Sequence, residues 1–150
     1  MPDYDVDGLA LQKVYTGPDG NLSRHVALMQ ITRTTTRAAG DREFIAPLPQ
    51  GMMVHDVRAI IEDGQGAASN IDVGHVQKGE GSWADDPDYF LDGQSIQNPA
   101  AVSSLFTTRH APLKITAKDV FLTATFNAAI PNNQDVRIRF YIDYEYIGTL

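Results

Sequence analysis

Hydrophobic and polar residues alternate along positions 136–147, near the C-terminal end of the chain. One parity carries Val136, Ile138, Phe140, Ile142, Tyr144 and Tyr146, and the other carries Arg137, Arg139, Tyr141, Asp143 and Glu145. Successive side chains of a β-strand point to opposite faces, so a period of two predicts a long strand with one face on an apolar core and one face in water. A helix over the same residues would scatter the arginines into the core. We expect the rest of the fold to form around this strand.

Shorter segments with similar patterns predict further strands. Together with the last strand they are residues 9–16, 23–36, 42–46, 53–62, 68–76, 113–118, 120–130 and 136–147. Turn sequences separate several of them, namely Gly17-Pro18-Asp19-Gly20, Asp63-Gly64-Gln65-Gly66 and Pro131-Asn132-Asn133. We expect the first two turns to close hairpins, so that residues 53–62 pair with residues 68–76.

Residues 78–108 form the longest stretch without a strand pattern, and glycines and prolines are distributed along it. A loop of that length in a compact domain is expected to contain some structure or to perform a function. We expect a short helical or irregular segment at residues 86–92 and another at residues 99–105, where Pro99 suits a first helical position.

About eight strands with little helix predict an all-β fold, an antiparallel β-sandwich that is jelly-roll-like. An immunoglobulin-like sandwich is the alternative, which the size of the chain and its missing Cys and Trp signature disfavour. We expect residues 1–150 to form a single domain, with residues 1–16 as an extended N-terminal arm. Residues 1–7 carry three aspartates and a proline. They are expected to be exposed, either as a disordered end or as an arm that orders on a neighbouring subunit.

Composition narrows the classes of protein. The hydrophobic fraction of 43% and the charged fraction of 21% are typical of a globular protein, and 150 residues can bury roughly 70% of the unfolded surface. No apolar run approaches the ~18 residues that cross a bilayer, and the start of the chain lacks the pattern of a signal peptide, so neither export by that route nor a membrane location is expected. The net charge of −7 opposes binding to a phosphate backbone, so nucleic acid is not an expected partner.

No pattern of catalytic or metal-binding residues stands out. The chain has no cysteine, and no G-x-S-x-G or phosphate-binding glycine loop occurs. The four histidines, His25, His55, His75 and His110, lie in separate segments without ligand spacing. The acidic residues 85–93 do not match a calcium loop, although a bound cation there is left open. We therefore expect no catalytic residues, no cofactor and no metal.

Two groups of side chains are candidates for contact with partners. Trp83, Tyr89 and Phe90 lie in the predicted long loop, either as an interface or as a plug that folds back on the open end of the sandwich. The arginines at positions 33, 37 and 42 could meet an acidic neighbour, although a solvated face is the favoured interpretation.

Several motifs resemble a pattern in small virion proteins of tailed bacteriophages. They are Leu48-Pro49-Gln50-Gly51, the turn Asp63-Gly64-Gln65-Gly66, Ile71-Asp72-Val73-Gly74 and Asp88-Tyr89-Phe90-Leu91-Asp92-Gly93, followed by two alternating strands. The resemblance covers residues 48–147 and includes no catalytic residues. Members of this group include capsid decoration, or cement, proteins with a jelly-roll-like sandwich, which sit as homotrimers on the phage head and bind the major capsid protein.

The resemblance implies a structural virion protein, not an enzyme, located on the outer surface of the capsid and made in the host cytoplasm. It would stabilise the head as a homotrimer bound to the major capsid protein. Our guessed partner contacts are Tyr4, Val6, Leu9, Trp83, Tyr89 and Phe90. The alternative is a tail or fibre module that binds a host-surface carbohydrate through exposed aromatic side chains. A third hypothesis, a cupin-type enzyme, would need the histidines to converge on a metal.

Overall fold

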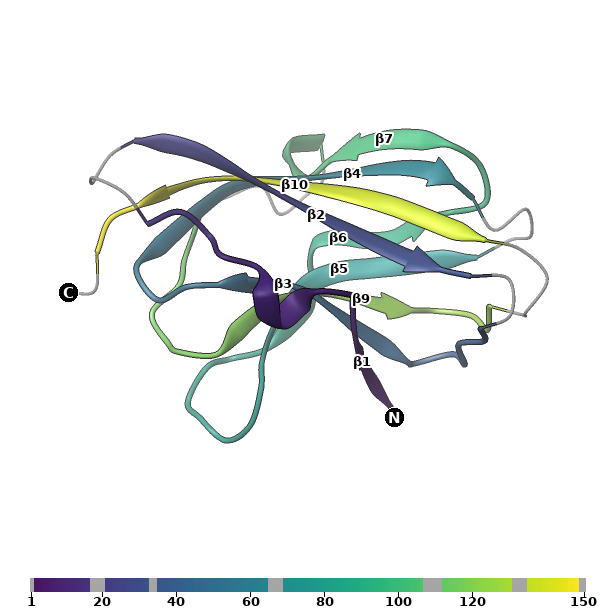
Figure 1. The fold of residues 1–150 in the computed structure, drawn as a ribbon, viewed down its shortest axis with the longest axis horizontal. Helices are drawn as coiled ribbons and strands as arrows, with labels where there is room; N and C mark the ends of the chain where they lie inside the picture. Colours follow the sequence, from purple (N-terminus) through teal and green to yellow (C-terminus); the bar gives the residue numbers. More distant parts are fainter. Residues whose placement is uncertain are drawn as a thin grey trace.

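The computed structural model describes residues 2–16, 21–32, 35–64, 69–106, 112–130 and 135–148. These residues form ten strands and two short 3₁₀-helices, arranged as two sheets that face each other (Figure 1). The first sheet has the strand order β1-β3-β9-β5-β6. The second has the order β2-β10-β4-β7, with β8 also paired to β4. The all-β sandwich predicted from the sequence is confirmed, with ten strands in place of about eight.

The first sheet contains β1 (Asp3–Asp5), β3 (Arg42–Leu48), β5 (Asn70–Gln77), β6 (Asp86–Ser95) and β9 (Val120–Phe126). The second sheet contains β2 (Leu22–Ile31), β4 (Met52–Asp63), β7 (Ala100–Ser103), β8 (Leu113–Lys114) and β10 (Val136–Tyr146). The 3₁₀-helices are η1 (Leu9–Leu11) and η2 (Ser104–Phe106). Among the described residues no helix is long and apolar enough to span a membrane.

The predicted C-terminal strand, β10, lies inside the second sheet between β2 and β4 (Figure 1). Its apolar parity from Val136 to Tyr144 is at most 1% exposed and packs into the core, whereas the alternate residues from Arg137 to Glu145 are half-buried on the outward face. The alternation therefore correctly predicted both the strand and the face of it that is buried. Because an inner strand has neighbours on both sides, β10 joins the two other long strands of its sheet.

Without β1 and β8, the two sheets have the orders β3-β9-β5-β6 and β2-β10-β4-β7. This arrangement is jelly-roll-like, with two Greek keys folded onto each other. The chain crosses from the second sheet to the first between β4 and β5, and β5 pairs with β9 and β6. The expected hairpin of residues 53–62 with residues 68–76 is therefore wrong, because the strands belong to different sheets. Both strands, β4 and β5, were predicted close to their true bounds, but their partners were not.

Other expectations from the sequence also need correction. Residues 9–16 form η1 followed by extended chain rather than a strand, and β2 pairs with β10 rather than with them. Residues 86–92 belong to strand β6, not to a helical segment, because β5 offers them a pairing edge. The strand expected at 113–118 is reduced to Leu113–Lys114. The turns at 17–20, 65–66 and 131–133 lie outside the described residues.

Candidate functional site

The N-terminal segment, which we define as residues 2–16, lies on its own sandwich. Strand β1 pairs in parallel with β3, and the backbone N–H of Val6 donates to the carbonyl of Phe44 at 3.1 Å. Val6 and Leu9 are each 7% exposed and belong to the hydrophobic core. These are apolar side chains in an otherwise acidic stretch, and burying them offsets the ordering of the chain end.

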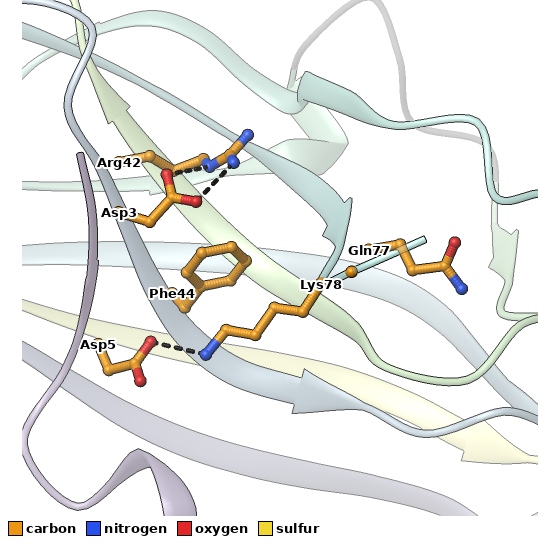
Figure 2. Close-up of a pocket in the computed structure, with 7 residues that line it drawn as sticks. Asp3, Asp5, Arg42, Phe44, Gln77 and Lys78 are labelled. Atoms are coloured by element: carbon orange, nitrogen blue, oxygen red, sulfur yellow. Dashed lines mark hydrogen bonds and ion pairs between the residues drawn. The ribbon is translucent and has the colours of Figure 1, made fainter. Parts of the chain in front are cut away.

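Side chains on one face of β1 form ion pairs with the sheet (Figure 2). Asp3 accepts two hydrogen bonds from Arg42, at 3.2 and 3.0 Å, and Asp5 accepts one from Lys78 Nζ at 2.8 Å. Between these pairs the Phe44 ring forms the floor of an open cavity of about 590 Å³. Lys78 Nζ lies 4.5 Å from the centre of that ring. Two cations and two carboxylates thus face one another around an aromatic floor.

The other face of β1 covers a buried ion pair. Arg37 Nε donates to Glu43 Oε1 at 2.7 Å, and the Tyr4 ring lies 3.8 Å from the Arg37 guanidinium carbon. The side chain of Glu43 is only 3% exposed. Burial raises the pKa of Glu43, and the bond from Arg37 opposes that rise. Tyr4 therefore shields a charge pair that would cost free energy if it lost a member.

The remainder of the N-terminal segment reaches the second sheet. Gln12 donates from Nε2 to the carbonyl of Ile45 in β3, and its Oε1 is 2.7 Å from His25 Nε2 in β2. Farther along, the Tyr144 hydroxyl of β10 donates to the carbonyl of Tyr15. Figure 1 shows the segment in purple, running from β1 past β3 toward the start of β2. The segment thus connects the edges of both sheets.

The aromatic side chains expected at an interface form a cluster around His75. The imidazole is 3% exposed, and the rings of Trp83, Tyr89 and Phe90 lie 5.1, 5.2 and 6.3 Å from its centre. Phe90 is buried in the core, and Trp83 and Tyr89 pack against it from partly exposed positions. Of the two alternatives left open by the sequence, the packing matches the one in which the aromatics fold back on the sandwich.

One hydrogen bond fixes the tautomer of His75, and burial keeps its ring uncharged. Trp83 Nε1 donates to His75 Nδ1 at 2.9 Å, so Nδ1 is an acceptor and the neutral ring carries its proton on Nε2. Within the described part of the chain, Nε2 is buried without a hydrogen-bond partner. Burial lowers the pKa of His75 to about 4, against a weaker opposite effect of Asp85. The imidazole is therefore uncharged at neutral pH.

The large exposed apolar side chains lie mainly in the N-terminal segment and in β2. Over the described residues, the large exposed hydrophobic side chains are Leu11 (84%), Tyr15 (60%), Leu22 (72%), Val26 (43%) and Leu105 (53%). The first two lie in the N-terminal segment, and the next two lie in β2, which the Gln12 to His25 bond joins to that segment. We call Leu11, Tyr15, Leu22 and Val26 the apolar surface. Groups of this kind on a folded domain often mark a contact with another protein.

The described residues contain no group of three or more histidines and carboxylates placed to hold a metal ion. His25, His55 and His75 take part in separate contacts, with Gln12, Glu145 and Trp83 respectively. His110 lies outside the described residues, as does Arg33. The other two arginines of the expected basic cluster, Arg37 and Arg42, form ion pairs with Glu43 and Asp3. They are therefore neither a free basic patch nor a solvated face.

The six guessed contact residues have different environments. Val6, Leu9 and Phe90 are buried, whereas Tyr4, Trp83 and Tyr89 are partly exposed. The role of these six residues in an interface stays a prediction, and the three buried side chains are packed in the core of their own chain.

Sequence reasoning missed the residues that receive β1, above all Arg42 and Lys78, and it missed the central place of His75 among the aromatics. One signal was available: Asp3, Tyr4 and Asp5 alternate as residues of a strand do, which should have suggested pairing to a sheet rather than a free arm. The partners of these residues are 39 and 73 positions away along the chain, and the sequence held no indication of them.

The structure is similar to solved structures of bacteriophage capsids. A chain from the capsid of Ralstonia phage GP4 matches with a TM-score of 0.69 and 17% identity, over 97% of this chain and 98% of that one. A chain from the capsid asymmetric unit of cyanophage Pam1 matches with a TM-score of 0.60 and 14% identity, over 89% and 91%. The likeness establishes the fold. No protein family and no curated protein matches the sequence.

Proposed function

We propose that this chain is a structural virion protein that binds the major capsid protein of a tailed phage and stabilises the head. The observation that carries the proposal is the match to capsid chains of two phages over nearly the full length of both chains. The finer role that we propose is decoration: a homotrimer added to the outer surface of a shell, after synthesis in the host cytoplasm, with no chemistry of its own.

The distribution of side chains supports a protein that folds alone and then binds a shell. The inward parities of the long strands fill one core, and the net charge of −7 favours solubility before assembly. The apolar surface on the N-terminal segment and β2 is the contact that we propose for the shell. A homotrimer that makes the same weak contact three times would bind a symmetric shell more tightly than a single copy does.

The first experiment measures the mass of the purified protein by light scattering and then its sedimentation with empty shells. We expect a trimer that pellets with the shells. Leu11→Asp is expected to reduce occupancy, because Leu11 is 84% exposed and its loss leaves the core unchanged. Leu105→Asp, at an exposed position outside the apolar surface, is the matched control. A monomer that stays in the supernatant contradicts the proposal. Equal occupancy of the two variants contradicts the apolar surface as the contact with the shell.

A second candidate function, binding of a host-surface carbohydrate, is favoured by one cavity. This cavity of about 440 Å³ is lined by Trp83 and Tyr89 together with polar groups that include Ser82 and Asp85. Sugars bind where aromatic faces adjoin polar side chains. Glycan binding that is lost in Trp83→Ala and kept in Tyr15→Ala, an exposed aromatic elsewhere, would favour this function over the capsid role. Absence of glycan binding by the intact protein would eliminate it.

A further inference from the structure

We propose that β1 is an exchangeable strand, and that the site it occupies beside β3 accepts β1 from a second copy of this chain in the same register. We call this site the β3 groove and define it by Arg37, Arg42, Phe44 and Lys78. The inference goes beyond the proposed virion role and does not require it.

Most contacts that hold β1 lie near the surface. The strand has three residues, and the ion pairs on its outward face involve Asp3 and Asp5, whose side chains are 42% and 55% exposed. Exposed ion pairs contribute little to stability, and short edge strands open locally at a small fraction of the cost of global unfolding. We therefore expect β1 to leave the sheet far more often than the rest of the fold opens.

An empty β3 groove is unfavourable, so it refills. With β1 in place Phe44 is 2% exposed and Glu43 is 2% exposed. Departure of the strand hydrates the Phe44 ring and removes the Tyr4 ring from the buried Arg37 guanidinium. A vacant groove leaves Arg42 and Lys78 without their carboxylates. Both the apolar and the charged groups therefore favour the return of a strand.

The occupant is specified by charge and spacing. A strand that fills the groove must carry carboxylates at two positions of one face, to meet Arg42 and Lys78, and an aromatic ring between them, to stack on Arg37. Residues 3–5 have this pattern, Asp-Tyr-Asp. A second copy of the chain presents the same three side chains, so its β1 is fully complementary to the groove.

The chain has a hinge at the required place. Gly8 adopts φ +77° between β1 and η1, and the space around it is open. Residues 2–7 together span about 20 Å when extended, so they can reach an adjacent subunit. Val6 moves with the strand and fills the equivalent core position of the other copy. Because each copy has one strand and one groove, head-to-tail exchange closes into a ring in which every groove is filled.

Disulfide trapping tests the exchange in purified protein without shells. The chain contains no cysteine, so introduced thiols have no competitors. Residues 3 and 42 are in register, and adjacent strands lie about 4.8 Å apart, which a disulfide can bridge. Asp3→Cys protein and Arg42→Cys protein of a different mass are mixed, incubated and oxidised. We expect a mixed disulfide between the two chains as a main product on a non-reducing gel.

Two controls fix the interpretation. Thr125→Cys replaces Asp3→Cys in a parallel mixture; Thr125 faces Arg42 from β9 inside the same sheet, so it should not reach another chain. The double variant Asp3→Cys/Arg42→Cys shows that the bond can close within one chain. If the double variant closes but the first mixture gives no more mixed disulfide than the Thr125→Cys mixture, the exchange does not occur. Shell binding would be unaffected by that result, so the virion role is tested separately.

Charge reversal gives a test that needs no disulfide. Asp5→Lys and Lys78→Asp each place like charges across the groove in their own chain. In a mixture, the reversed strand is complementary to the reversed groove of the other variant, so native mass spectrometry should show hetero-oligomers in excess of their statistical share. A mixture with the statistical proportions of the two variants overturns the proposal.

Discussion

The fold should lose stability in mild acid because His75 is buried as a neutral ring. The pKa of His75 is about 4 in the native protein, against an ordinary value of 6.5. A charged ring would need a proton on Nδ1, the atom that accepts the hydrogen bond from Trp83. Protonation thus costs both the desolvation of a charge and the indole bond, and these costs keep the native imidazole neutral.

The sign of the effect follows from which state binds the proton. Above pH 6.5 the ring is neutral in both the native and the unfolded chain, so it adds no pH dependence. Between pH 6.5 and pH 4 the unfolded chain takes up a proton that the native protein does not, so the free energy of unfolding falls as pH is lowered. At about 1.4 kcal/mol per pH unit, the total loss is roughly 3 kcal/mol, and it ends near pH 4.

Urea unfolding followed by the fluorescence of Trp83, the single tryptophan, measures this loss. The comparison is between wild type and His75→Asn at about pH 7.5 and about pH 4.5; the amide can still accept the indole bond but does not titrate. We expect the wild type to lose roughly 2 to 3 kcal/mol more than the variant between these conditions. Equal losses would show that other groups, such as buried carboxylates, account for the acid sensitivity and would refute the reasoning.

Two contrasts test the packing of the sandwich by urea or thermal unfolding. Arg37→Met leaves Glu43 buried and unpaired and should destabilise the fold by about 3 to 5 kcal/mol. Arg24→Ala removes an exposed ion pair and should cost at most about 1 kcal/mol. Similar costs for the two variants would mean that burial of the charge does not determine the loss of stability. Phe140→Ala removes a fully buried ring of β10 and should cost about 3 to 5 kcal/mol. Leu22→Ala, at a 72% exposed position, should cost less than about 1 kcal/mol, and a larger loss would show that the apolar surface supports the fold.

The long strands could be predicted because their own residues alternate between apolar and polar, as burial of one face of a strand requires. Strand β10 buries one parity and alternates along almost its whole length, and β4 alternates on either side of the adjacent buried residues Asp56 and Val57. Strand β6 was missed because three aspartates, a proline and a glycine make residues 86–95 read as a loop. Its edge position tolerates these residues, and register shifts opposite β5 accommodate them. Local propensity was overridden there by pairing with a distant strand.

The pairing of strands was not accessible from local pattern. A turn between two alternating segments favours a hairpin, yet β4 and β5 lie in different sheets. Which strands pair depends on how the apolar faces of the two sheets pack together. Strand β5 pairs with β9, which lies about fifty positions later in the chain. The candidate site depends on the same distant pairings. Aromatic residues near position 90 were identified from the sequence, but His75 at their centre could not be.

The N-terminal segment closes the core of its own chain, and we propose that it also binds the shell, so experiments must separate these two roles. Its buried residues, Val6 and Leu9, close the core, whereas its exposed residues, Leu11 and Tyr15, face outward. Deleting residues 1–7 would therefore weaken shell binding for either of two reasons, lost contact or an uncovered Phe44. A substitution confined to Leu11 removes only the outward contact. If Leu11→Asp keeps the unfolding free energy of the wild type but lowers occupancy on shells, the segment binds the shell directly. If only the deletion lowers occupancy, and it lowers the unfolding free energy as well, the segment acts through the fold.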